Sequence, residues 1–391
     1  MDLNNRRERR FLALYALAWA GSTIGYVPFL TLLLPMQVHL LAGSEAVRWL
    51  AATTFLGAIA ASVCNIAFGW LSDLAGRRKP FVLTGLLLSC AMLQAAPRVG
   101  SLTALIVVIA VWQLSLNLML GPLAAWAGDR VPDGRKGMLG GLLAFAPASG
   151  ALAGALVTLP FFADQVQRFA AVGAIVTVCV LPLVLLGEDG GRAGAEPATG
   201  GGEVASKVLR AMATRMWIAR LLVQVSEASL FAFFYLWLRS VDPVLADGAI
   251  ARVLLVAMIA GALAALLAGR WADRAGKPVV PLTLSSGGAA VGLVVMALAS
   301  GRDLAVAGYI LFGLSTSVFL ALHSAHTLRV LPDSTRRGRD LGLFNLTNTI
   351  PSLAVPALTL ALVPSLGFAA LFAVLAALAV AAMVLLSRLQ H

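Results

Sequence analysis

Long apolar stretches alternate with short polar breaks along the whole chain. Each stretch runs for roughly 18 to 30 residues, and a helix of that length crosses about 30 Å of hydrocarbon. The pattern therefore predicts twelve membrane-spanning helices. Their approximate ranges are 11–40, 46–72, 81–97, 101–128, 138–162 and 167–187, followed by 214–241, 249–271, 279–299, 304–330, 341–363 and 366–387.

Two of the polar breaks recur at a fixed distance. The glycines and the acid of Gly69-Trp70-Leu71-Ser72-Asp73-Leu74-Ala75-Gly76 return 200 positions later as Gly269, Asp273 and Gly276, and Pro132-Asp133 returns as Pro332-Asp333. Two loops that repeat at one offset indicate an internal duplication. We expect an all-α integral membrane protein whose twelve helices form two six-helix halves, residues 1–187 and 214–391. The Gly-rich linker over 188–213 is flexible, and the residues around 204–216 can form a short helix on the membrane surface.

Composition and charge support a membrane protein. With 60% hydrophobic and 12% charged residues, a soluble globule would have too little polar surface. The 29 Lys and Arg residues concentrate in alternate loops, and short basic loops stay in the cytoplasm. We therefore expect both termini on the cytoplasmic side of a bacterial inner membrane. The net charge of +11 is spread over many loops, which argues against nucleic-acid binding.

The sequence shows no pattern typical of an enzyme, a metal site or a channel. Cys64, Cys90 and Cys179 each lie inside a predicted span without metal-ligand spacing, so they are interpreted as packing residues. Paired carboxylates, a nucleophile with its base and a pore-loop segment are all missing from the sequence. We expect no catalytic residue, no metal and no cofactor, and the basic start of the chain leads into an uncleaved first span.

Glu227 is the only acid near the middle of a predicted span. An ionisable residue at the bilayer centre costs about 2.5 to 3.5 kcal/mol on insertion scales, so it points to a function. Arg220 and Gln224 share its helical face at i, i+4 and i+7 spacing, and Phe231 and Tyr235 continue that face. A carboxyl in a partly dry cavity can exchange protons near neutral pH. The alternative is a structural Glu227 that Arg220 or a neighbouring helix satisfies.

The first repeated loop resembles a known signature. The residues Gly69-x-x-x-Asp73-x-x-Gly76-Arg77-Arg78-Lys79 resemble the loop of the major facilitator superfamily between its second and third helices. Residues 76–81 and 342–351 are also similar to bacterial relatives of the sucrose and glycoside-type sugar permeases. The resemblance implies a transporter that works by alternating access.

For the two loops, the resemblance implies a role in holding the cytoplasmic side closed. Asp73 would dock at the start of the eleventh helix and Asp273 at the start of the fifth, since an acid stabilises a helix amino terminus. The alternative is that the loops only set the topology. The predicted gating residues are Gly69, Asp73, Gly76, Arg77, Arg78, Asp273 and Gly276.

In this superfamily the first, fourth, seventh and tenth helices line the substrate cavity, so their polar stripes are the predicted binding residues. Aromatic faces with amides suit a sugar, and equally a planar aromatic ligand, while interhelical packing is the alternative for each of them. The candidates are Tyr15, Trp19, Thr23, Tyr26, Gln113, Asn117, Arg220, Gln224, Phe231, Tyr235, Thr316 and Phe319. His323 and His326 join Glu227 as candidate proton carriers, because imidazoles are uncommon in spans and titrate near neutral pH.

Taken together, the residues and the resemblance predict a proton-coupled secondary transporter of a small polar, sugar-like solute, which acts as a monomer in the bilayer and is powered by the proton gradient. One departure weighs against sugar symport: the permease relatives carry membrane acids in their first half, and the first, second and fourth spans here have none in their interiors. Proton-antiport efflux of drug-like or other small organic molecules is therefore the rival prediction. A membrane receptor that does not transport is a remote one.

Overall fold

The computed structural model describes residues 2–131, 139, 143, 145–187, 205–275, 279–330 and 337–388. Over these residues the chain is helical and contains no strand. Nine helical stretches in the described part are long and apolar enough to cross a membrane, and two of them, Arg7–Ala75 and Ile350–Ser387, have the length of two spans. The all-α membrane fold that the apolar pattern predicts is therefore confirmed.

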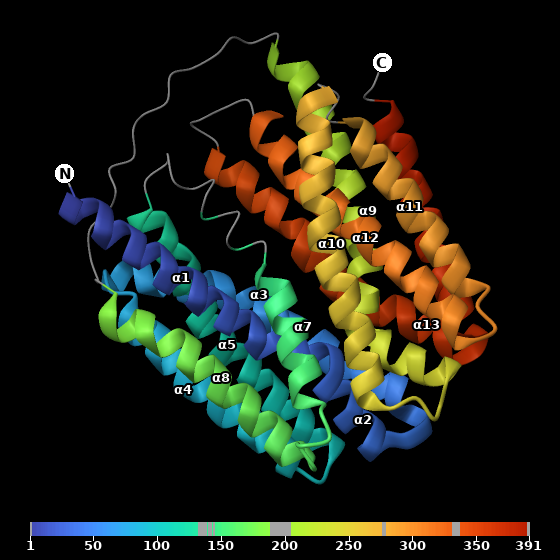
Figure 1. Cartoon of the computed structure of the whole chain (residues 1–391), viewed down its shortest axis with the longest axis horizontal. Coiled ribbons are helices and arrows are strands. Elements are labelled where there is room, and N and C mark those ends of the chain that lie inside the picture. The colour runs from blue at the N-terminus through green and yellow to red at the C-terminus, as the bar shows by residue number, and fades with distance from the viewer. Residues whose placement is uncertain are drawn as a thin grey trace. The chain divides into compact units, whose positions relative to one another are not determined.

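The chain divides into two compact units, Met1–Ala195 and Glu196–His391, and the division lies inside the predicted linker. The first unit, drawn from blue to green in Figure 1, contains the described parts of the first six predicted spans. Its elements are α1 (Asp2–Pro28), η1 (Phe29–Leu33), α2 (Leu34–Ala42), η2 (Gly43–Glu45), α3 (Ala46–Ala75), α4 (Lys79–Ala95), η3 (Ala96–Arg98), α5 (Leu102–Arg130), α7 (Ala146–Val157) and α8 (Gln165–Leu186).

The second unit contains the other six spans in five helices. They are α9 (Ala205–Val241), α10 (Asp247–Ala275), α11 (Val279–Ala297), α12 (Arg302–Val330) and α13 (Arg337–Ser387). Within α13 the backbone leaves helical geometry at Gly367, where φ is 75°, a conformation that glycine adopts readily. This break separates the two spans predicted at 341–363 and 366–387.

The start of α9 corrects one expectation. Residues 205–216 are helical, but they continue directly into the seventh span as one helix of 37 residues. They do not form a separate helix that ends before the span. No proline or glycine interrupts the chain from Ala205 to Val241, so nothing in the sequence forces a break between the two segments.

The first span is not a regular α-helix over its whole length. Between α1 and α2 the five residues of η1 form a π-helical turn. Pro28 immediately precedes this turn and Pro35 follows it, and proline has no N–H to donate to the α-helical ladder. A π turn accommodates one additional residue in the helix, so the span stays continuous while its side-chain register changes.

Glycines let the same two spans approach closely in each unit. A Cβ on Gly85 of α4 would lie 2.4 Å from the backbone nitrogen of Met119 on α5. In the second unit a Cβ on Gly292 of α11 would lie 2.7 Å from the backbone nitrogen of Phe312 on α12. Small residues at such contacts let helix backbones pack without intervening side chains. The third and fourth spans of both units thus share one packing device, as a duplication predicts.

Candidate functional site

Glu227 lies at a cavity inside the second unit. Three helices supply the lining residues: Glu227, Leu230 and Phe231 on α9, Leu254, Ala257 and Met258 on α10, and Tyr309, Phe312, Gly313, Thr316 and Ser317 on α12. The cavity has a volume of about 60 Å³. Glu227 is the only carboxyl in this lining, and its side chain remains partly exposed.

Small residues bring α10 and α12 together beside this cavity. A Cβ on Gly313 would touch the Cβ of Ala257 at 3.4 Å. One turn further along α10, a Cβ on Gly261 would lie 2.3 Å from the Oγ of Ser317. Tyr309, Phe312 and Thr316 follow one another at helical spacing, so α12 presents one continuous face to the cavity.

Two groups interact electrostatically with Glu227. Arg220 lies seven residues earlier on the same helix, about 10 Å along the axis, and its side chain is buried. Tyr309 comes from α12 and lines the cavity with Glu227. Because α9 is helical from Arg220 through Tyr235, the predicted shared face of Arg220, Gln224 and Glu227 is present. The role of these residues in transport stays a prediction.

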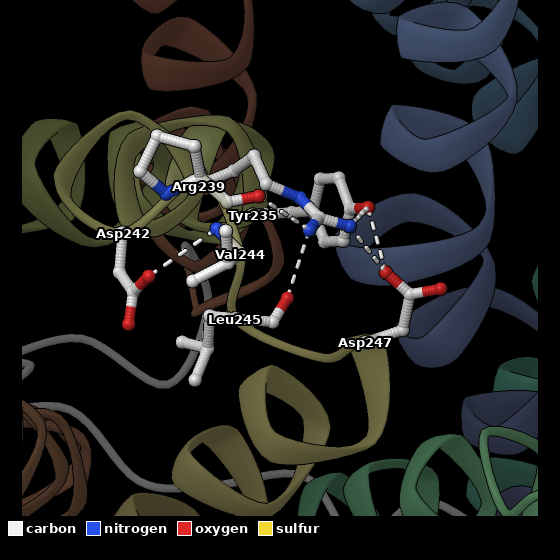
Figure 2. Close-up of polar contacts among 7 residues, drawn as sticks. Tyr235, Arg239, Asp242, Val244, Leu245 and Asp247 are labelled. Carbon is white, nitrogen blue, oxygen red and sulfur yellow. Dashed lines mark hydrogen bonds and ion pairs between the residues drawn. The ribbon is translucent and has the colours of Figure 1, made fainter.

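Tyr235 lies in a separate polar cluster at the junction of α9 and α10, which Figure 2 shows. Its hydroxyl donates to Asp247 Oδ1 at 2.9 Å and accepts a hydrogen bond from Arg239 Nη2 at the same distance. Arg239 also donates to Asp247 Oδ1 at 2.8 Å and to the carbonyls of Pro243 and Leu245. These bonds hold the turn between the two helices, and Tyr235 is not among the residues that line the Glu227 cavity.

Arg78 is the centre of a second cluster, in the first unit. Its guanidinium donates to Ser72 Oγ at 2.6 Å, to Asp73 Oδ1 at 2.5 Å and to Asp129 Oδ2 at 3.0 Å. Burial alone would lower the pKa of Arg78, but the hydrogen bonds and charges of Asp73 and Asp129 outweigh it and raise that pKa. Arg78 thus joins the end of α3 to the end of α5 as a permanently charged bridge.

Gly76 ends α3 just before this bridge. Its φ of 63° is in the left-handed region that glycine occupies without strain, and its N–H donates to the carbonyl of Asp73 at 3.2 Å. The turn places Arg78 back beside Ser72 and Asp73. Gly76 and Arg78 of the repeated loop are therefore explained by local structure: the glycine makes the turn, and the arginine forms the bridge. The sequence did not predict Asp129 as a partner of Arg78.

Comparisons with known proteins agree with this architecture. Residues 216–390 match the sequence model of the Major Facilitator Superfamily. The whole chain has the fold of solved transporter structures, with coverage of both chains at 95% or more in the three described next. The second half of the chain is thus similar to the major facilitator superfamily. At 11 to 14% identity, the likeness of the whole chain to these structures is a likeness of fold.

Three solved structures illustrate the likeness. A POT family transporter in complex with 5-aminolevulinic acid has a TM-score of 0.75 at 11% identity, and the match covers 96% of this chain and 95% of that one. A bacterial homologue of the human lysosomal transporter Spinster gives 0.69 at 14% identity, with coverages of 97% and 95%. A mutant of the nucleoside transporter NupG gives 0.70 at 14% identity, with coverages of 97% and 99%. No curated protein matches the sequence significantly.

The packing of the second unit separates His323 from the Glu227 cavity. His323 is fully buried on α12, and its Nε2 lies 2.8 Å from the carbonyl oxygen of Met216, which requires an N–H on that nitrogen. Phe319, one turn earlier on α12, is buried in an apolar cluster with Ala219 and Val223 of α9. The ring centroids of Phe319 and His323 are 5.3 Å apart. Neither residue lines the cavity. The side chain of His326 lies outside the described residues.

Several predicted binding residues of the first unit have contacts within that unit. Tyr15 is buried between Phe11 and Trp19, with ring centroids 6.0 and 6.1 Å apart. Thr23 donates to the carbonyl of Trp19 at 3.0 Å. On α5, Asn117 Nδ2 donates to the carbonyl of Gln113 at 2.8 Å, and on α1 Tyr26 is partly exposed. Substrate contact by any of them stays a prediction.

In the second unit, two of the predicted binding residues line the Glu227 cavity and the others do not. Phe231 and Thr316 line the cavity with Glu227, and Thr316 also donates to the carbonyl of Gly313 at 3.3 Å. Gln224 lies one turn before Glu227 and is partly buried. The geometry therefore groups Glu227, Phe231 and Thr316, whereas Tyr235 and Phe319 have contacts of their own elsewhere in the unit.

The docking contacts predicted for the two loop aspartates stay predictions. The side chain of Asp273, the whole of Gly276 and residues 132–138 lie outside the described part of the chain. In the first loop, Arg77 is exposed, and a Cβ on Gly69 would meet no atom within 4 Å. The observed contacts of Asp73 are those with Arg78 and with the N–H of Gly76.

Replacing Arg78 with lysine should weaken the bridge between α3 and α5. Lysine keeps the charge but loses the planar fork that contacts Ser72, Asp73 and Asp129 together. We expect the free energy of unfolding to fall by about 1 to 2 kcal/mol, since part of the cluster is exposed to solvent. Thermal unfolding of the purified protein measures this change. The matched control is Arg77→Lys at the exposed neighbour, and equal melting of the two variants would contradict the bridge.

Proposed function

We propose that the protein is a proton-coupled secondary active transporter of a small organic solute, and that Glu227 carries the coupling proton. One observation supports the proposal above the others: a single carboxyl lies at a cavity inside a membrane-spanning unit, among largely apolar walls. An ionised carboxylate is costly in such surroundings unless it is protonated or paired. Binding of a proton and binding of a solute at one cavity are therefore energetically linked.

The neighbouring groups fit a carboxyl that changes its charge during transport. Arg220 is close enough to favour the ionised form of Glu227, but it does not line the cavity. The walls from α10 and α12 are apolar apart from the hydroxyls of Tyr309, Thr316 and Ser317. No residue on these walls forms a direct contact that would fix Glu227 in its protonated or its ionised form. Both forms can therefore take part in a transport cycle.

Two classes of solute follow from the candidate residues. A sugar-like solute suits the aromatic and amide side chains that the first and fourth spans carry, such as Trp19 and Gln113. A more apolar or cationic molecule suits the cavity itself, where Phe231, Met258 and Phe312 accompany Glu227. The second class corresponds to proton antiport.

The orientation in the membrane follows from the charge of the loops. The basic loops favour a topology in which both termini lie in the cytoplasm of a bacterial cell.

Transport measurements on the purified protein in lipid vesicles test the coupling. A panel of labelled solutes should include a disaccharide, choline and a neutral amide. At least one of them should accumulate or be extruded against its gradient when a pH gradient is imposed, because the proton gradient is the energy source. A protonophore should abolish this movement. Solute movement that is identical with and without the pH gradient would rule out proton coupling and leave a facilitator.

A further inference from the structure

The walls of the Glu227 cavity share one electrostatic character. Phe231, Tyr309 and Phe312 bring three aromatic rings to it, and the faces of such rings carry partial negative charge. Glu227 adds a carboxylate to the same space. Phe234 stacks on Tyr309 with ring centroids 4.2 Å apart, which holds the tyrosine ring from outside the lining. A carboxylate among aromatic rings is the arrangement that attracts organic cations.

No cationic side chain belongs to this lining. Around Glu227, α10 contributes Leu254, Ala257 and Met258, which carry no charge, and α12 contributes the titratable hydroxyl of Tyr309. Arg220, seven residues earlier on α9, interacts electrostatically with Glu227 and is not part of the lining. Two described contacts of α13 with α9 are uncharged: Phe372 packs on Trp237, and the carbonyl of Leu375 accepts from Ser226. The lining therefore carries one acidic and no cationic side chain, while Arg220 acts on Glu227 from outside the lining.

The size of the cavity limits what enters it. One water needs about 10 to 15 Å³ measured in this way, so the volume of about 60 Å³ corresponds to about four waters. That space suits a compact head group with its tail directed elsewhere. A disaccharide is far larger than this space, so within this cavity the charged head of a small organic molecule fits better than a whole sugar.

We propose that this cavity binds the ammonium group of an organic cation, with Glu227 as the counter-charge and Phe231, Tyr309 and Phe312 as the aromatic walls. The inference rests on the proposed function, in which the same Glu227 carries the coupling proton. A proton and an ammonium group then compete for one carboxylate, since a protonated Glu227 no longer balances the charge of the ligand. Mutually exclusive binding of this kind moves the proton and the cation in opposite directions.

Equilibrium binding of choline to the full-length protein in nanodiscs tests the inference. The matched neutral probe is 3,3-dimethyl-1-butanol, which has the shape of choline without its charge. We expect choline to bind at least about tenfold more tightly than the alcohol, and we expect its affinity to fall as the pH is lowered because protons compete for Glu227. Glu227→Gln should remove the preference for choline. Asp303→Asn, at an exposed acid on α12, should leave it unchanged.

A second variant separates the aromatic walls from the carboxylate. Phe231 is partly exposed, so Phe231→Leu should fold, and it should weaken choline by about 3- to 30-fold while the affinity for the alcohol changes little. Equal affinities for choline and the alcohol in the native protein would overturn the inference. So would a choline affinity that Glu227→Gln leaves intact.

The outcomes also separate this inference from the proposed function. If choline binding depends on Glu227 but no solute moves in response to a pH gradient, the cation site stands and proton coupling fails. If a pH gradient drives solute movement through Glu227 while choline binds no better than its neutral analogue, coupling stands and the cation site fails.

Discussion

Glu227→Gln is expected to abolish transport driven by a pH gradient. Glutamine has nearly the shape of the protonated acid and can still form hydrogen bonds, so the cavity should keep its structure. It cannot release a proton, however, and the proposed coupling has no other carboxyl in the cavity lining to use. We expect solute movement against a gradient to fall to the level of vesicles without protein.

Two comparisons make this result specific. Asp303→Asn removes a carboxylate that is almost fully exposed at the start of α12, so it should leave gradient-driven transport unchanged. Glu227→Asp keeps the acid on a shorter side chain and should retain part of the activity. If Glu227→Gln still concentrates the solute with normal pH dependence, the assignment is wrong, and His326 becomes the next residue to test.

Gly292→Ala is expected to disrupt the packing of the second unit, although it adds only one methyl group. The new Cβ would lie 2.7 Å from the backbone nitrogen of Phe312 and 2.9 Å from the carbonyl oxygen of Gly308. Backbone atoms inside a helix cannot rotate away as a side chain does, so α11 and α12 must separate. Overpacking of this kind costs about 1 to 3 kcal/mol and occasionally more, and we expect the upper part of that range.

The matched control is Gly301→Ala, in the turn between the same two helices, where a Cβ meets no atom within 4 Å. Gly85→Ala should reproduce the effect in the first unit, because its Cβ would meet the backbone of Met119. The measurements are the yield of monodisperse protein on size exclusion and the thermal unfolding midpoint. Similar unfolding midpoints for Gly292→Ala and Gly301→Ala would show that α11 and α12 do not pack as closely at Gly292 as the structure indicates.

Much of the fold follows from the sequence because two physical signals are strong. A run of apolar residues long enough to cross hydrocarbon has few alternatives to a spanning helix, and the break at Gly367 agrees with the predicted separation of the last two spans. Helix ends are harder to predict. Polar residues continue a helix as readily as they end it, which is why α9 begins at Ala205, well before its apolar segment.

The candidate site shows the same division. Glu227 is predictable because a charged group in mid-span is costly and therefore conspicuous. Asp129 and Asp247 are not, because acids at span ends are inexpensive and common, and their partners Arg78 and Arg239 are identified only by contacts in space. The burial of His323 against Met216 could not be inferred either, because its partner is a backbone carbonyl on another helix.

The π-helical turn of η1 has a consequence for comparing the two units. The first span holds one additional residue there, while α9, the corresponding span of the second unit, is α-helical throughout. Side chains of the first span before and after η1 therefore keep different registers relative to those of α9, so equivalent positions in the two spans cannot be assigned by one fixed numerical offset.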